Sequence, residues 1–162
     1  MRQLVLIAEN LRSLHNVGSL LRTAEGLGCQ KVYLTGYTPY PKQPNDSRLP
    51  HESARLTRQI HKTALGAENI ATYSHDIEPL ISKLKKDGFE VIALEQDPNS
   101  VDITSYNPPD KCALIVGNEV SGVSSETLKQ SDTCLEIPML GKKESFNVVQ
   151  SAAMALFYLR FM

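Results

Sequence analysis

Short hydrophobic runs recur along the chain, and a segment with helical periodicity follows most of them. Runs of this kind, without polar alternation, are typical of strands that are buried on both faces of a parallel sheet. They predict six strands, at residues 4–8, 31–35, 70–73, 89–94, 112–116 and 134–137. Strands that alternate with helices indicate an α/β domain with a mainly parallel six-stranded sheet and helices on both faces.

The segments between the strands, and the one after the last strand, predict five helices. They lie at about residues 16–27, 51–64, 76–87, 124–130 and 146–161. The first carries apolar residues at i, i+3, i+4, i+7 and i+10 from Val17, and Gly28 is placed to end it in the left-handed conformation. The last has almost no polar face, and an apolar helix of this kind at a chain end favours a subunit interface.

Residues 36–50 contain four prolines among polar residues, so we expect a long loop there. A loop of this length in a compact domain is usually functional or mobile. From residue 42 to residue 62, two acids stand against five basic residues, namely Lys42, Arg48, Arg55, Arg58 and Lys62. This stretch is either a solvated face or a local patch that binds a polyanion.

The composition is that of an ordinary globular domain. With 162 residues, 41% hydrophobic and 22% charged, we expect a single domain over residues 1–162. The net charge of −1 gives no global signal for nucleic-acid binding. The three cysteines lie beside or within predicted strands, which favours buried thiols in a reducing compartment. Because no apolar run fits a signal peptide or a membrane span, we expect a cytoplasmic protein that does not bind a membrane.

Two predicted strands end in loops that carry polar groups, at residues 117–122 and 138–147. Ligands bind at the carboxyl ends of parallel strands, so these loops form a site hypothesis. The spacing from Gly117 to Ser124 is that of a P-loop, but Val123 stands where a phosphate-binding loop needs lysine. The dinucleotide fingerprint is absent, no Cys/His metal spacing occurs, and Ser145 lacks a partner base and the Gly-x-Ser-x-Gly motif. These patterns argue against nucleotide hydrolysis, a nicotinamide cofactor, a metal and a nucleophilic serine.

Three motifs follow one another along the chain in a distinctive order. They are Asn16-Val17-Gly18-Ser19-Leu20-Leu21-Arg22, then Gly117-x-Glu119-x-x-Gly122, then Ile137-Pro138-Met139-x-Gly141-x-x-x-Ser145-Phe146-Asn147-Val148. Together they resemble the motifs of the SpoU (TrmH-like) branch of the SPOUT RNA ribose 2′-O-methyltransferases. The resemblance covers nearly the whole chain.

The resemblance implies a SPOUT-like fold, in which the C-terminal segment forms a trefoil knot, and a homodimer, here through the C-terminal helix. It also implies that S-adenosylmethionine binds among the knot loops. The cofactor residues carried over are Leu94, Val116, Gly117, Ile137, Met139, Ser145 and Phe146. The apolar residues of this set are core residues by default. As cofactor residues they would form the apolar slot that an adenine ring needs.

The catalytic residues that the resemblance implies are Arg22, Asn16, Glu119, Ser145 and Asn147. Arginine effectively never deprotonates in proteins, so we expect Arg22 to hold an RNA phosphate and align the 2′-hydroxyl rather than act as a base. The other four would orient Arg22, the ribose or the cofactor. The implied RNA contacts are Arg22, Lys42, Arg48, Arg55 and Arg58. In an arbitrary protein the basic side chains would be solvated charges, Glu119 would cap a turn, and Ser145 and Asn147 would cap the last helix.

The chain departs from the family pattern in two ways. Phe146 replaces the more usual leucine, and the chain begins at the first strand, so we expect no separate N-terminal RNA-binding domain. Substrate choice then relies on phosphates and shape, which favours a structured RNA, and tRNA over rRNA. The alternative function is a catalytically inactive RNA-binding dimer that retains the fold. The intact catalytic set favours the enzyme.

Overall fold

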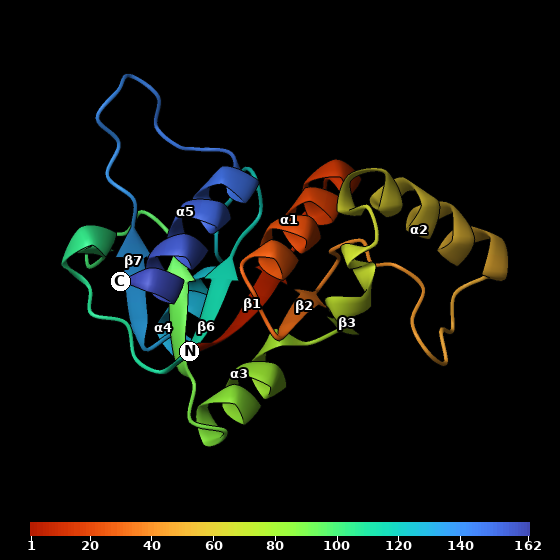
Figure 1. Ribbon diagram of the computed structural model, residues 1–162, viewed down its shortest axis with the longest axis horizontal. Helices are drawn as coiled ribbons and strands as arrows, with labels where there is room; N and C mark the ends of the chain where they lie inside the picture. The colour runs from red at the N-terminus through yellow and green to blue at the C-terminus, as the bar shows by residue number, and fades with distance from the viewer.

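The computed structural model describes residues 1–162 and contains one sheet of seven parallel strands (Figure 1). The strands are β1 (Gln3–Glu9), β2 (Lys31–Thr35), β3 (Ala71–Ser74), β4 (Glu90–Leu94), β5 (Val101–Asp102), β6 (Lys111–Val116) and β7 (Thr133–Glu136). Their order across the sheet is β3-β2-β1-β6-β4-β7-β5. The chain builds one half of the sheet outward from β1 through β2 to β3, and the other half holds β4 to β7, with β6 next to β1.

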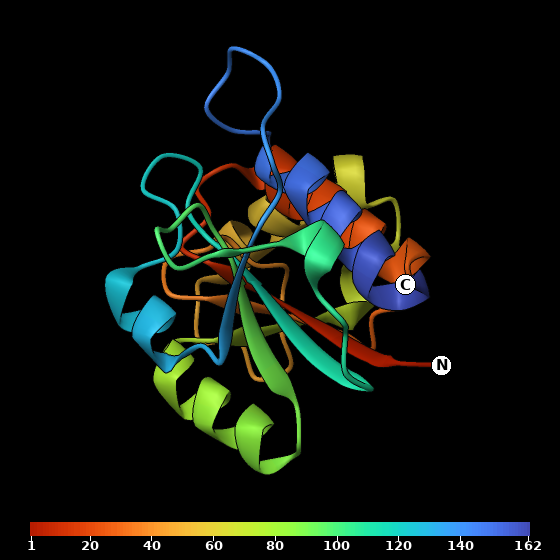
Figure 2. The same cartoon turned by 90° about the vertical axis from the view of Figure 1, so that its left-hand side faces the viewer.

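Helices cover both faces of the sheet, as the sequence predicts. They are α1 (Leu14–Gly26), α2 (Pro50–Ala64), α3 (Ile77–Lys86), α4 (Ser125–Gln130) and α5 (Val148–Phe161), with short 3-10 helices at η1 (Ala67–Ile70) and η2 (Ile103–Ser105). The larger hydrophobic core lies under α1, α2 and α5, and the smaller one lies under α3 and α4. Figure 2 shows α1 and α5 side by side on one face and the pair α3 and α4 on the other.

The prediction of six strands is wrong by one, because residues 95–111 contain the additional strand β5. Val101 and Asp102 pair with Leu135 and Glu136 of β7. A two-residue strand shows no hydrophobic periodicity, so the sequence pattern gave no signal for it. The other six strands lie within one or two residues of their predicted bounds.

Two helices begin at residues other than those predicted, because polar side chains cap them. The Ser13 hydroxyl accepts a hydrogen bond from the Asn16 N–H at 3.2 Å, so α1 begins at Leu14. The Asn147 side chain accepts from the Val149 N–H at 2.9 Å, so α5 begins at Val148 and leaves Phe146 outside the helix. Both are ordinary N-caps. Gly28 follows α1 at φ +72°, as predicted.

The first two helices approach each other very closely at Gly18. A β-carbon at this position would lie 2.4 Å from the backbone oxygen of Ile60 and 2.1 Å from the hydroxyl oxygen of Thr63. Glycine is therefore required where α1 crosses α2. Thr63 also donates a hydrogen bond to the backbone oxygen of His15 at 3.1 Å, which fixes the crossing near the N-terminal end of α1.

All three cysteines are free thiols, and Cys29 and Cys112 are buried. Burial raises the pKa of Cys29 to about 11 and that of Cys112 to about 12, which leaves both thiols protonated and unreactive at neutral pH. Cys134 is half-buried. None of the helices combines the length and the hydrophobicity that crossing a bilayer requires.

Candidate functional site

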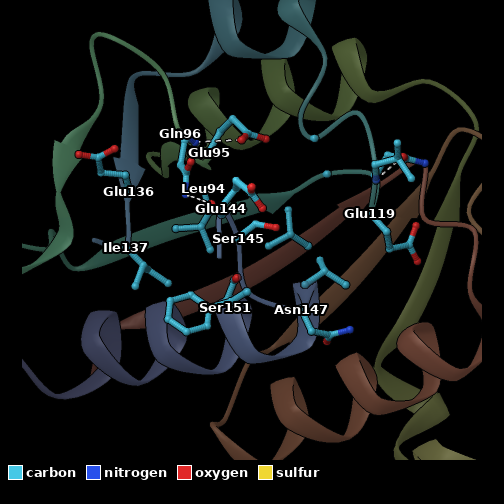
Figure 3. Close-up of a pocket in the computed structure, with 17 residues that line it drawn as sticks. Leu94, Glu95, Gln96, Glu119, Glu136, Ile137, Glu144, Ser145, Asn147 and Ser151 are labelled. Atoms are coloured by element: carbon cyan, nitrogen blue, oxygen red, sulfur yellow. Dashed lines mark hydrogen bonds between the residues drawn. The ribbon is translucent and has the colours of Figure 1, made fainter. Parts of the chain in front are cut away.

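A pocket of about 500 Å³ lies at the carboxyl ends of β4, β6 and β7, which are neighbours in the sheet (Figure 3). This volume falls within the usual range for small-molecule sites. Its walls come from the loops after these strands and from the first turn of α5. The lining residues are Leu94, Glu95, Gln96, Val116, Gly117, Asn118, Glu119, Val120, Gly122, Glu136, Ile137, Glu144, Ser145, Phe146, Asn147, Val148 and Ser151.

Six of the seven predicted cofactor residues line this pocket. They are Leu94, Val116, Gly117, Ile137, Ser145 and Phe146. Met139 is half-buried but is not among the lining residues. The pocket thus has an apolar part contributed by three separate strand ends.

The loop after β6 folds back on itself at the edge of the pocket. Asn118 and Gly122 exchange two backbone hydrogen bonds, at 3.0 and 2.9 Å. A β-carbon on Gly117 would lie 2.2 Å from backbone atoms of Gly122 and Val123, so only glycine fits there. Glu95 braces the loop from outside, because its carboxylate accepts a hydrogen bond from the Val123 N–H at 2.9 Å.

Glu119 joins this loop to the start of α1. Its carboxylate accepts hydrogen bonds from the backbone N–H of Arg12 at 3.0 Å, the backbone N–H of Ser13 at 3.1 Å and the side-chain amide of Asn16 at 3.0 Å. Burial alone would raise the pKa of Glu119, but these hydrogen bonds outweigh it, so the pKa lies below its ordinary value. Glu119 is therefore ionised at neutral pH, and its engaged carboxylate is a poor proton acceptor.

Asn147 extends this network into the third motif. Its side-chain nitrogen donates to the side-chain oxygen of Asn16 at 3.4 Å. The line Glu119–Asn16–Asn147 therefore connects all three sequence motifs at the mouth of the pocket, and Figure 3 shows Glu119 and Asn147 on the same side of it. Ser145 lines the pocket beside them, exposed, and its hydroxyl makes no hydrogen bond within the chain.

Arg22 does not lie with these residues. It is exposed on α1, it makes no hydrogen bond or ion pair, and it is not among the pocket residues. Six residues separate it from Asn16, which is a displacement of roughly 9 Å along the helix axis and a rotation away from the pocket-facing side. A single subunit thus brings together four of the five predicted catalytic residues.

The predicted RNA-contacting cations divide into two groups. Lys42, Arg55 and Arg58 are exposed and form no ion pair, and the Lys42 N–H donates to the hydroxyl of Thr57 on α2 at 2.8 Å. Lys42 therefore lies beside the same helix as the two arginines. Figure 1 shows the N-terminal half of α2 extending away from the sheet.

Arg48 belongs inside the loop, and this corrects its assignment to the RNA surface. Its guanidinium makes two hydrogen bonds to the Asp46 carboxylate, at 2.9 and 2.5 Å, and others to the backbone oxygens of Tyr40 and Pro41. It also lies over the Tyr40 ring, 3.5 Å from its centroid. Its ion pair with Asp46 and its position over the ring give Arg48 the structural role of ordering residues 40–48.

The structure adds pocket residues that the motifs did not indicate. Glu95 and Gln96 follow β4 directly, and the Gln96 side chain donates to the backbone oxygen of Glu144 at 2.7 Å across the pocket. Asn118 is only 8% exposed, and its side chain caps its own loop by accepting from the N–H groups of Val120 and Ser121. The sequence signal for these three residues was their position directly after a strand. This position does not indicate which side chain points into the pocket. No group of three or more His, Cys, Asp or Glu side chains is arranged to hold a metal ion.

Comparisons with known proteins agree with this geometry. The profile of the SpoU rRNA Methylase family matches residues 3–157. The chain is 32% identical over 155 residues to a 23S rRNA (guanosine-2′-O-)-methyltransferase of Neisseria meningitidis, over 94% of this chain and 56% of that protein. It is 25% identical over 156 residues to a tRNA (guanosine(18)-2′-O)-methyltransferase of Aquifex aeolicus, over 96% of this chain and 68% of that protein.

Solved structures give the same fold. An AdoMet-bound rRNA methyltransferase from Sinorhizobium meliloti superposes with a TM-score of 0.81 at 21% identity, over 99% of this chain and 57% of that one. The chain therefore spans little more than half the length of this structure and of the Neisseria relative. Hydrogen bonds join Asn16, Glu119 and Asn147, one residue from each motif, beside one pocket. The family profile extends over almost every residue, and the chain therefore belongs to the SpoU rRNA Methylase family.

Proposed function

We propose that this chain catalyses methyl transfer from S-adenosylmethionine to a ribose 2′-hydroxyl of a structured RNA. The observation that carries the proposal is the hydrogen-bonded line Glu119–Asn16–Asn147 at the mouth of the pocket. Three segments that are distant in sequence converge there on groups suited to orienting a ribose. A purely structural protein has no need for this arrangement beside an open pocket.

The residues of the pocket fit the cofactor. Leu94, Ile137 and Phe146 offer apolar surface for an adenine ring, and the absence of a side chain at Gly117 lets the backbone approach a ligand closely. Glu136 and Glu144 add carboxylates, which suit a positively charged sulfonium. When bound, S-adenosylmethionine supplies an electrophilic methyl group.

The side chains then have distinct tasks. Asn16 and Asn147 orient the ribose, because each amide still has donors or acceptors to offer a hydroxyl. Ser145 presents a free hydroxyl to the ribose or the cofactor. Arg22 holds the RNA phosphate, which fixes the 2′-hydroxyl in line with the methyl carbon. The Glu119 carboxylate already accepts hydrogen bonds from three donors, so we assign it a positioning role. The RNA phosphate then accepts the proton that leaves the 2′-hydroxyl.

A homodimer through α5 accounts for the position of Arg22. Met154, Phe157 and Phe161 are 39–62% exposed on α5, and Phe157 and Phe161 lie in contact with each other. Burying this apolar surface against a second copy is favourable. Because α1 packs beside α5, such a pairing carries Arg22 of one subunit toward the pocket of its partner.

The knot is part of the same proposal. β7 lies between β4 and β5, while the chain passes from β4 to β5 and then to β6 on the other side of β4. We propose that residues 95–110, which connect these strands, pass around β7. A C-terminal segment that runs from β7 through this loop to α5 is knotted, and the arrangement of the strands supports it.

The substrate is a structured RNA, with tRNA favoured over rRNA. The exposed cations Lys42, Arg55 and Arg58 on and beside α2 contact phosphates without reading sequence. The two relatives described above are named for 23S rRNA and for tRNA, so the comparisons do not decide between these classes. The alternative, an inactive RNA-binding dimer, is disfavoured by the intact network around Asn16.

Calorimetry with S-adenosylmethionine and with its demethylated product is the first test. We expect binding of both, followed by transfer of tritiated methyl groups to bulk tRNA and recovery of a 2′-O-methylated nucleoside. Bulk rRNA serves as the competing substrate. Absence of cofactor binding at millimolar concentration leaves only the alternative function.

The role of Arg22 has its own test. The Arg22→Ala variant should bind the cofactor normally and lose methyl transfer. If Arg22 acts across the interface, mixing this variant with Ser145→Ala should restore about one quarter of the wild-type activity, because half of the dimers are mixed and each then has one intact site. If both variants are inactive alone and also in the mixture, Arg22 acts within its own subunit. Full activity of Arg22→Ala contradicts its assignment.

A further inference from the structure

Tyr37 lies next to the pocket, on a backbone that two unusual conformations hold in place. Asn10, just after β1, has φ +56°, and Gly36, just after β2, has φ +63°. A β-carbon on Gly36 would lie 1.9 Å from the side-chain oxygen of Asn10, and this same oxygen accepts a hydrogen bond from the Tyr37 N–H at 3.1 Å. The next residue, Thr38, is buried and bonded to Ala8 and Leu11. The direction of the Tyr37 side chain is therefore fixed from both sides.

The ring of Tyr37 is anchored at its hydroxyl and yet open to solvent. Its hydroxyl oxygen accepts a hydrogen bond from the side-chain amide of Asn118 at 3.0 Å, while 63% of the residue is exposed. Asn118 is a pocket-lining residue from the loop that carries Glu119. An immobilised aromatic ring thus stands at the edge of the proposed ribose site with a face available.

The other tyrosine of the same loop shows the contrast. Tyr40 stacks on Tyr73 with ring centroids 3.7 Å apart and an interplanar angle of 13°. Arg48 lies 3.5 Å from the Tyr40 centroid and must occupy its opposite face. Both faces of Tyr40 are therefore covered by the chain itself, whereas Tyr37 has only its edge engaged.

We infer that Tyr37 is a stacking platform for a nucleobase of the RNA, at or beside the methylated nucleotide. The inference rests on the proposed function and names a residue that selects the substrate. Single-stranded RNA is recognised by stacking of unpaired bases on aromatic side chains. Because Tyr37 contacts the pocket wall through Asn118, a ribose held at Asn16 and Asn147 leaves its own base or the adjacent one close to this ring.

Kinetics of three variants test the role. Tyr37→Ala should raise the KM for bulk tRNA by at least about fivefold, leave cofactor binding unchanged, and change kcat much less than KM. Tyr37→Trp should retain most of the activity because it keeps the aromatic surface, and Tyr37→Phe should do so if the hydroxyl serves only as an anchor. Wild-type KM in Tyr37→Ala, or a loss in Tyr37→Phe as large as in Tyr37→Ala, overturns the inference.

A fluorescence test separates this inference from the proposed function. The chain contains no tryptophan, so Tyr37→Trp introduces a single reporter. Stacking of a base should quench its emission when bulk tRNA is added, whether or not methyl transfer occurs. The control is Tyr33→Trp, since Tyr33 is half-buried against the core under α3 and should not respond. If the enzyme is active but tRNA does not quench the emission, the stacking inference is refuted and the proposed function stands. If tRNA quenches the emission but no methyl group is transferred, the proposed function is refuted and the stacking inference stands.

Discussion

Two of the loops that line the pocket differ in how firmly the chain holds them. The loop at 117–123 is bonded to itself through Asn118 and Gly122, to Asn16 of α1 through Glu119, and to the loop after β4 through Glu95. The loop at 137–147 has an exposed tip, with Leu140 98% exposed and nothing within 4 Å of a β-carbon on Gly141. One wall of the pocket is therefore preorganised, and the other is free to adjust to a ligand.

The difference predicts opposite outcomes for alanine at two glycines. Gly117→Ala places a β-carbon against the backbone of Gly122 and Val123, and overpacking of this kind costs about 1–3 kcal/mol. We expect cofactor affinity to fall by roughly 10- to 100-fold, measured by calorimetry. Gly141→Ala is the matched control, and we expect it to bind as the wild type does. Equal effects of the two substitutions would contradict the contrast between the walls.

An effect of similar size, on the reaction rather than on cofactor binding, is expected when the charge of Glu119 is removed. Glu119→Gln keeps the size of the side chain but offers an amide to three donors, so at least one hydrogen bond to a charged group, worth about 1.5–3 kcal/mol, is lost. We expect kcat for RNA methylation to fall by about tenfold or more. Glu144→Gln, on the adjustable wall, should weaken cofactor binding and leave kcat at saturating cofactor unchanged. A larger loss in the control would reverse the assignment of the two walls.

Glu119 also predicts a pH dependence of stability. Its pKa in the folded protein is lowered, so its contribution is complete above its ordinary pKa of about 4.3 and is lost as the pH falls through the folded-state value. Between about pH 5 and pH 3 the wild type should lose more stability than Glu119→Gln in urea denaturation. Asp46, whose pKa Arg48 also lowers, is present in both proteins, so the difference between them isolates Glu119. Parallel curves would show that its hydrogen bonds do not stabilise the fold.

The smallest effect is expected at Gln96, which bonds the loop after β4 to the loop at 137–147. Gln96→Ala removes the bond to the Glu144 backbone oxygen, and an exposed bond of this kind contributes about 0.5–1.5 kcal/mol. We expect a two- to tenfold loss of cofactor affinity, chiefly through faster dissociation in stopped-flow measurements. A slower dissociation would show that the bond hinders binding.

Most of the fold followed from the sequence because the buried strands are uninterrupted apolar runs. Strand β5 could not be predicted, since Val101 and Asp102 are a strand only through their pairing with β7. In the same way, the positive charge of Arg48 did not reveal that Asp46 and the backbone of its own loop satisfy it. The motifs grouped Asn16, Glu119 and Asn147, and hydrogen bonds join these side chains in the structure. Motif spacing gave no signal that Arg22 lies on another part of the α1 surface, because that depends on helix geometry.

The close crossing of α1 and α2 has a consequence for how RNA affinity can change. Gly18 lies two residues after Asn16, and α2, which bears Arg55 and Arg58, rests directly on it. Any side chain at position 18 has to push α2 outward, because backbone and hydroxyl atoms leave no free volume there. The basic helix is therefore set at a fixed angle to Asn16 and Asn147, and a single methyl group at this crossing would misalign the proposed RNA contacts on α2 with the amides proposed to orient the ribose.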